Sequence, residues 1–133
     1  MTLFESKTYV VDIDGVIAEQ DSLCKTCKYE ASSPITKNIE AVNKLYDEGH
    51  YIKYFTARGM GTYDDATRAS QRWEELTKCQ LKMWGCKYHE LIMGKPSFDI
   101  LIDDKSLDFK RDWLINLDQK LKNKIKIFKN NKC

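Results

Sequence analysis

The pattern of apolar and polar positions predicts a chain in which strands alternate with helices. Runs of apolar and β-branched residues predict strands over residues 7–13, 51–56, 90–93 and 98–102. Apolar residues at helical spacing predict a helix that starts with Thr36 as its N-cap and a longer helix from residue 62 or 64 to about residue 79. This order of elements predicts an α/β fold, a three-layer Rossmann-like sandwich around a mainly parallel central sheet.

Two further segments complete a single predicted domain over residues 1–133. Residues 15–34 form a long connection inside a compact chain, and we interpret it as a flap over the end of the first strand. Apolar residues at positions 117, 121, 125 and 128 predict a C-terminal helix over about 117–128 with a solvated, lysine-rich face.

Composition narrows the classes of partner. The chain is 42% hydrophobic and 32% charged, values that are typical of globular proteins. A formal net charge of +2 argues against nucleic acid as a partner. No apolar run is long enough for a membrane span, and the first residues do not resemble a signal peptide, so we expect a cytoplasmic protein with no membrane partner.

The five cysteines include one close pair, Cys24 and Cys27. An odd number rules out a complete set of disulfides within one chain. The pair could form half of a zinc site that Cys79, Cys86 or His89 completes, but a single pair also fits ordinary reduced thiols.

Polar residues follow the predicted strands at the points where these strands end. The residues concerned are Asp12, Asp14, Thr56, Arg58, Lys95, Asp103 and Asp104. Because the carboxyl ends of parallel strands share one edge of a sheet, these side chains are expected to converge there. Two close carboxylates repel each other, so the first pair implies a cation, a shared proton or two separate roles.

The chemistry that suits this set of residues is phosphoryl transfer. Asp12 can act as the nucleophile and form an aspartyl-phosphate, while Asp14 can protonate the leaving alcohol and then activate water. Thr56 can donate a hydrogen bond to a phosphate oxygen, and Lys95 supplies positive charge. Several carboxylates also suit Mg²⁺, which prefers oxygen ligands.

These motifs resemble those of the haloacid dehalogenase (HAD) superfamily of phosphatases. Residues 12–16 match its first motif, Thr56 the second, Lys95 the third and residues 102–104 the fourth. The resemblance implies Asp12 as nucleophile and metal ligand, and Asp14 as acid/base with its main-chain carbonyl on Mg²⁺. It implies Asp103 as the third protein ligand, with Asp104 as a further ligand or a residue that orients one.

Residues 55–59, 94–96 and 102–105 resemble more narrowly the small members without a cap domain that act in capsular-polysaccharide biosynthesis. This resemblance places Thr56, Ala57, Arg58 and Lys95 around the phosphate or substrate. Arg58 could equally be a structural arginine that pairs with a carboxylate. Without a cap, substrate choice falls to the flap, to the turn at 58–65 or to a neighbouring subunit, so self-association to a homo-oligomer is a further expectation.

The resulting function hypothesis is an Mg²⁺-dependent phosphomonoesterase that acts on a small phosphorylated metabolite, such as a sugar, polyol or amino-alcohol phosphate. One alternative is a nucleotide or nucleic-acid 3′-end phosphatase of the same superfamily. A different class is a signalling receiver module that is phosphorylated on an aspartate, although Thr56 stands where a receiver would carry that residue. A non-catalytic binding module is the third class.

Overall fold

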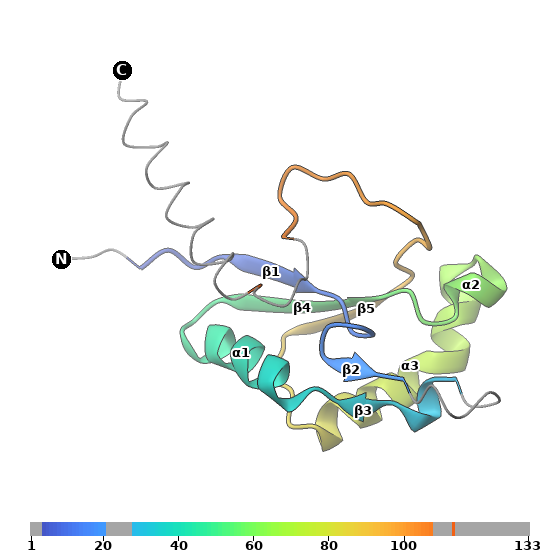
Figure 1. Ribbon diagram of the computed structural model, residues 1–133, viewed down its shortest axis with the longest axis horizontal. Helices are drawn as coiled ribbons and strands as arrows, with labels where there is room; N and C mark the ends of the chain where they lie inside the picture. Colours follow the sequence, from blue (N-terminus) through green and yellow to red (C-terminus); the bar gives the residue numbers. More distant parts are fainter. Residues whose placement is uncertain (1–3, 21–27, 108–112, 114–133) are drawn as a thin grey trace. The chain divides into compact units, whose positions relative to one another are not determined.

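The computed structural model describes residues 4–20, 28–107 and 113. The chain divides into two compact units, Met1–Ser97 and Phe98–Cys133. The first unit contains all the named strands and helices (Figure 1). The predicted single domain over residues 1–133 stays a prediction.

A three-stranded parallel sheet is the centre of the first unit. Its strands are β1 (Thr8–Val11), β4 (Tyr51–Thr56) and β5 (Glu90–Met93), in the spatial order β1-β4-β5. Val11 lies opposite Tyr54, and Thr56 lies opposite Met93, so the three strands end at the same edge. The predicted α/β class with a parallel sheet is therefore confirmed, and the architecture is compatible with a Rossmann-like sandwich.

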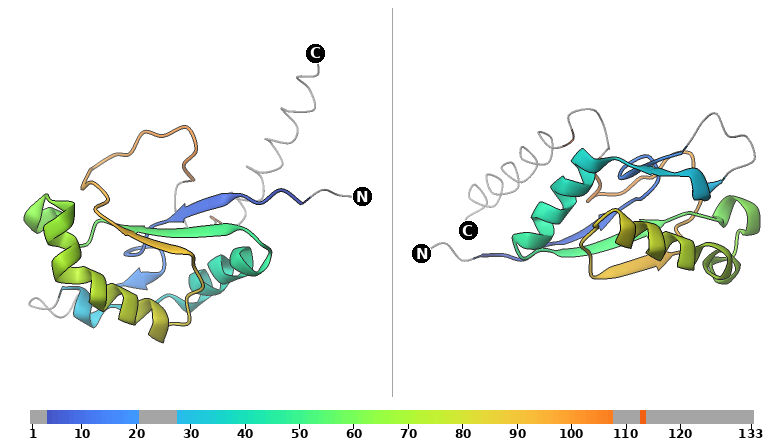
Figure 2. Two further views of the ribbon diagram at one scale, coloured as in Figure 1. Left: turned by 180° about the vertical axis from the view of Figure 1, so that it is seen from behind. Right: turned by 90° about the horizontal axis from the view of Figure 1, so that it is seen from below.

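Helices connect the three strands. α1 (Thr36–Asp47) joins β1 to β4 after the long connection, and α2 (Met60–Tyr63) and α3 (Ala66–Met83) join β4 to β5. Two right-handed crossovers that proceed in the same direction place both long helices on one face of the sheet, as Figures 1 and 2 show. Among the described helices, none is both long enough and apolar enough to cross a membrane.

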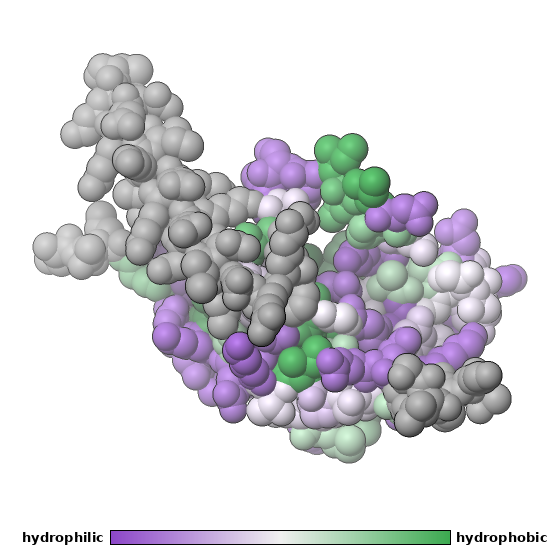
Figure 3. Space-filling view, viewed as in Figure 1, coloured by the Kyte–Doolittle hydropathy of each residue, from purple (hydrophilic) through white to green (hydrophobic). Residues whose placement is uncertain are grey.

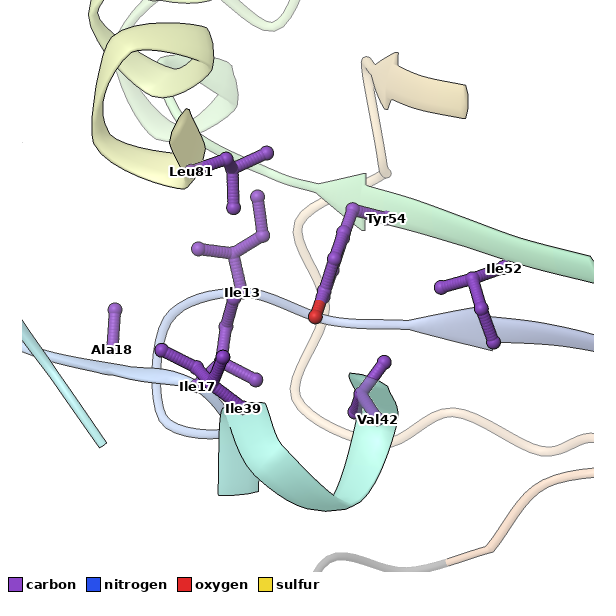
Figure 4. Close-up of a cluster of buried hydrophobic side chains, with 8 residues drawn as sticks. All are labelled: Ile13, Ile17, Ala18, Ile39, Val42, Ile52, Tyr54 and Leu81. Carbon is purple, nitrogen blue, oxygen red and sulfur yellow. The ribbon is translucent and has the colours of Figure 1, made fainter. Parts of the chain in front are cut away.

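The hydrophobic core lies between the sheet and these two helices. Alternate residues of β4 point to the helices, and Ile52 and Tyr54 are fully buried there. Leu81 of α3 points toward Ile13 in the turn that follows β1 (Figure 4). The other members of the cluster are Ile17, Ala18, Ile39 and Val42. The turn that carries the candidate acids is thus anchored in the core.

The predicted flap contains a second, antiparallel sheet of two short strands. These strands are β2 (Ala18–Glu19) and β3 (Ser33–Pro34), and the 3₁₀ helix η1 (Tyr29–Ala31) precedes β3. Cys24 and Cys27 lie outside the described residues, so the zinc hypothesis stays open.

The second unit corrects one prediction. Residues 98–102 form no strand, and their apolar side chains are exposed, with exposed fractions of 80% for Ile100 and 93% for Ile102. Figure 3 shows apolar groups at the surface of the drawn face. Residues 98–102 have the composition of a strand, but no described residue of this unit pairs with them. A strand needs a partner for its main-chain hydrogen bonds. The helix predicted over 117–128 lies outside the described residues.

Burial of Cys86 predicts that stability falls at alkaline pH. Burial raises the pKa of this thiol to about 11 from 9.0, and the neighbouring Tyr54 hydroxyl opposes the change only in part. The folded protein therefore keeps a proton that the unfolded chain releases, so the stabilisation is complete below pH 9 and is lost as the pH rises toward 11. The free energy of unfolding, measured with urea at these two pH values, should fall less from the lower to the higher pH in Cys86→Ala than in wild type.

The matched control for this experiment is Cys79→Ala, because Cys79 is exposed. This variant should keep the wild-type fall in stability. An equal fall in all three proteins would show that folding does not raise the pKa of Cys86.

Candidate active site

The first two acids lie in a tight turn directly after β1. The main-chain carbonyl of Ile13 accepts hydrogen bonds from three N–H groups, those of Val16, Ile17 and Ala18. Gly15 has φ +87°, a conformation that glycine adopts without steric cost. The buried Ile13 separates Asp12 from Asp14, and each carboxylate has its own cationic partner. The repulsion between the two acids is thus offset by two different cationic side chains, Lys95 for Asp12 and Arg58 for Asp14.

Asp12 pairs with Lys95. The Lys95 Nζ lies 3.4 Å from Asp12 Oδ2, and the side chains keep exposed fractions of 16% and 35%. Burial raises the pKa of the Asp12 carboxyl, while the Lys95 charge and the hydrogen bond from the Ile13 N–H oppose this rise. Lys95 thus supplies the local charge that favours an ionised Asp12 at the end of β1.

Thr56 holds the middle of this edge. The Lys95 main-chain N–H donates to the Thr56 carbonyl at 3.0 Å, which continues the β4–β5 pairing beyond Met93. The buried Thr56 hydroxyl accepts from the Arg58 N–H at 3.1 Å and keeps its own proton to donate. The Ala57 carbonyl accepts from the Met60 N–H at 2.9 Å, so Ala57 belongs to the turn that starts α2.

Arg58 pairs with Asp14 and is only 1% exposed. Its Nε donates to Asp14 Oδ2 at 2.9 Å, and its Nη2 donates to Asp14 Oδ1 at 3.0 Å. Nη1 donates to the Thr77 hydroxyl at 3.1 Å and to the Gln80 side-chain oxygen at 2.6 Å. Of the two predicted roles for Arg58, the structure shows the pairing with a carboxylate.

Asp103 and Asp104 lie in the second unit, in exposed chain without a helix or strand. Asp103 Oδ1 accepts from the Lys105 N–H at 2.8 Å, and its carbonyl accepts from the Ser106 hydroxyl at 3.3 Å. Among the described residues, no three His, Cys, Asp or Glu side chains are grouped so that they could hold a metal ion. The assignment of these two acids, Asp12 and Asp14 to Mg²⁺ therefore stays a prediction.

The sequence reasoning missed the residues of α3 that hold Arg58. Thr77 and Gln80 are 0% and 5% exposed and lie on the same buried face of α3 as Trp73 and Leu81. Two polar residues within an apolar helical stripe are the signal that could have identified them, because a buried polar side chain requires a hydrogen-bond partner. The partner in this structure is the guanidinium of Arg58.

Comparisons with known proteins bear on the fold. No protein-family model and no curated protein matches the chain. Among solved structures, the chain is similar to the crystal structure of an MCSG target from Vibrio cholerae. The TM-score is 0.68 and the identity 23%, over 86% of this chain and 98% of that one. At this identity the similarity shows a shared α/β fold, and it carries no statement about activity.

Gly94, the residue before Lys95, should tolerate no side chain, because it packs closely against Ala66 of α3. It has φ +90°, and a Cβ atom there would lie 2.6 Å from the Ala66 Cβ. We expect Gly94→Ala to destabilise the protein by about 2–4 kcal/mol, from the left-handed conformation and the steric clash together. Urea unfolding measures this loss. Gly61→Ala is the matched control, since nothing lies within 4 Å of its added Cβ; comparable losses in both variants would contradict the close packing at Gly94.

Proposed function

We propose that this protein is an Mg²⁺-dependent phosphomonoesterase that works through an aspartyl-phosphate on Asp12. The observation that carries the proposal is the close placement of polar residues at the ends of three adjacent parallel strands. Asp12 directly follows β1, β4 ends at Thr56, and β5 leads through Gly94 into Lys95, whose ammonium lies 3.4 Å from the Asp12 carboxylate. A nucleophile, a hydroxyl donor and a cation at one sheet edge are what phosphoryl transfer requires.

Each residue then has a role that its surroundings favour. Asp12 attacks phosphorus, and Lys95 offsets the repulsion between the carboxylate and the phosphate. Thr56 can donate its hydroxyl proton to a phosphate oxygen, since the hydrogen bond from the Arg58 N–H occupies only a lone pair of the hydroxyl oxygen. Asp14 transfers a proton to the leaving alcohol and later removes one from the attacking water. Asp14 therefore takes up a proton from solvent before the alcohol leaves, and its oxygens keep lone pairs for this proton beside the two bonds from Arg58.

The residues of the first unit are compatible with a magnesium ion. The Asp12 carboxylate is partly desolvated and lies 3.4 Å from the Lys95 ammonium, and Mg²⁺ is commonly held by one or two carboxylates, waters and substrate phosphate. Asp12 and the main-chain carbonyl of Asp14 would hold it, with Asp103 and Asp104 as the ligands predicted from the sequence. The ion would neutralise negative charge on the transferring phosphoryl group.

A panel of phosphate esters tests the proposal. Wild-type protein should release phosphate from at least one small sugar, polyol or amino-alcohol phosphate in the presence of Mg²⁺ and lose this activity with a chelator. Nucleoside monophosphates and an oligonucleotide with a 3′-phosphate form the second arm, and preference for these would assign the alternative substrate class. Absence of release from every ester would overturn the proposal, and a stable phosphoprotein formed from a small phosphodonor would favour the receiver module.

A further inference from the structure

We infer that Arg58 is a positioning residue that orients the Asp14 carboxylate for proton transfer, and that it is not a phosphate ligand. This inference rests on the proposed function and deepens it, because it assigns the group that controls the acid/base step. It also extends the machinery to α3, whose Thr77 and Gln80 side chains accept hydrogen bonds from Arg58.

The guanidinium of Arg58 is engaged by hydrogen bonds within the protein. All three of its side-chain nitrogens donate to groups of the protein: Nε and Nη2 to the two oxygens of Asp14, and Nη1 to α3. A bidentate contact of this kind fixes the plane of the carboxylate as well as its position. Each Asp14 oxygen keeps a second lone pair, which can carry the transferred proton.

Two residues of α3 fix Arg58 in turn. The Thr77 hydroxyl donates to the Trp73 carbonyl at 2.8 Å, so its remaining capacity is to accept, and it accepts from Nη1. The Gln80 amide nitrogen donates to the Tyr29 carbonyl at 2.7 Å, which directs the Gln80 oxygen to the guanidinium. Both side chains are therefore oriented by hydrogen bonds that do not involve Arg58.

The predicted flap covers this arrangement. The Tyr29 ring lies 4.9 Å from the centre of the guanidinium, and it also packs edge-on against Trp73 with ring centroids 4.8 Å apart. Water is thus excluded from a cation that is 1% exposed. A buried guanidinium that left Asp14 for a phosphate would abandon a bidentate partner at a large desolvation cost.

The test uses the dependence of the reaction on the leaving group. An alkyl alcohol needs a proton as it departs, whereas p-nitrophenolate departs without one. If Arg58 positions Asp14 as the acid, Arg58→Lys should lower kcat/KM for an alkyl phosphate by about 10²-fold or more. For p-nitrophenyl phosphate, the fall in kcat/KM of the same variant should be at least roughly tenfold smaller, because proton transfer contributes little to that reaction. Gln80→Leu, which removes one support of Arg58, should show the same preference to a smaller degree.

Controls separate this role from a phosphate contact and from a folding defect. Arg72→Met removes an arginine from α3, one whose side chain is 51% exposed, and should leave both rates unchanged. Added guanidinium, below denaturing concentrations, should restore part of the alkyl phosphate activity of Arg58→Ala. Equal losses for both esters in Arg58→Lys and Gln80→Leu, with a raised KM, would overturn the inference. Wild-type protein that turns over neither ester would overturn the proposed function and this inference with it.

Discussion

Replacement of Asp12 with asparagine should abolish phosphate release while the protein stays folded. Asparagine has nearly the same volume and can still accept the hydrogen bond from the Ile13 N–H, which is 2.9 Å long in the wild type. It cannot attack phosphorus as a carboxylate does. We expect kcat to fall by roughly 10⁴-fold or more, as for the loss of other enzyme nucleophiles, measured by phosphate release from the best ester.

The matched control is Asp47→Asn, the same chemical change at an exposed position at the end of α1. Asp47 pairs with the exposed Lys87 side chain, and such pairs contribute about 0–1 kcal/mol, so activity should stay at the wild-type level and stability near it. Unchanged activity in Asp12→Asn would mean that Asp12 is not the nucleophile and that the residues at the strand ends do not have the proposed roles.

The largest effect on stability is expected for Leu81→Ala. Leu81 is fully buried in the cluster that joins α3 to the turn after β1. Truncation of a buried leucine to alanine costs about 2–5 kcal/mol, because apolar burial is lost and a cavity remains. Urea unfolding followed by circular dichroism measures this change in the free energy of unfolding.

Met83→Ala is the control for this substitution, since Met83 belongs to the same helix and is 73% exposed. Its effect should stay within about 0.5 kcal/mol, as is usual for surface positions. Similar losses for both variants would contradict the packing of α3 on the sheet through Leu81.

Much of the sheet could be predicted from the sequence because the pattern and the fold agree locally. The strands at 51–56 and 90–93 were predicted with the bounds that the structure shows. The long helix was predicted from residue 62 or 64 to about residue 79, whereas α3 begins at Ala66 and continues to Met83. Its N-cap is Asp65, which accepts from the Thr67 N–H. Thr36 proved to be the first helical residue of α1 and not its N-cap.

The segment 98–102 shows where this reasoning fails. Its apolar residues have strand propensity, but propensity does not specify a partner, and a sheet forms only where two segments satisfy each other's main-chain groups. In the structure these residues are irregular and exposed. The prediction from a single segment therefore could not establish its pairing.

The candidate site likewise contains residues that could be placed from the sequence and one whose role could not be predicted from it. Asp12, Thr56 and Lys95 could be placed from the sequence, because each follows an apolar run that ends at a common edge. The role of Arg58 could not, because it depends on Thr77 and Gln80, which α3 brings to it from about twenty positions further along the chain. Such contacts follow from helix packing, and local sequence spacing does not encode them.

The most direct test of the account is to locate the phosphoryl group on the protein during turnover. Wild-type protein would be mixed with a ³²P-labelled form of its best ester and Mg²⁺, quenched in acid and mapped by peptide. The account predicts acid-stable, base-labile label on Asp12, with no label in Asp12→Asn or when the metal is withheld. Turnover without label on Asp12, or label on another residue, would contradict it.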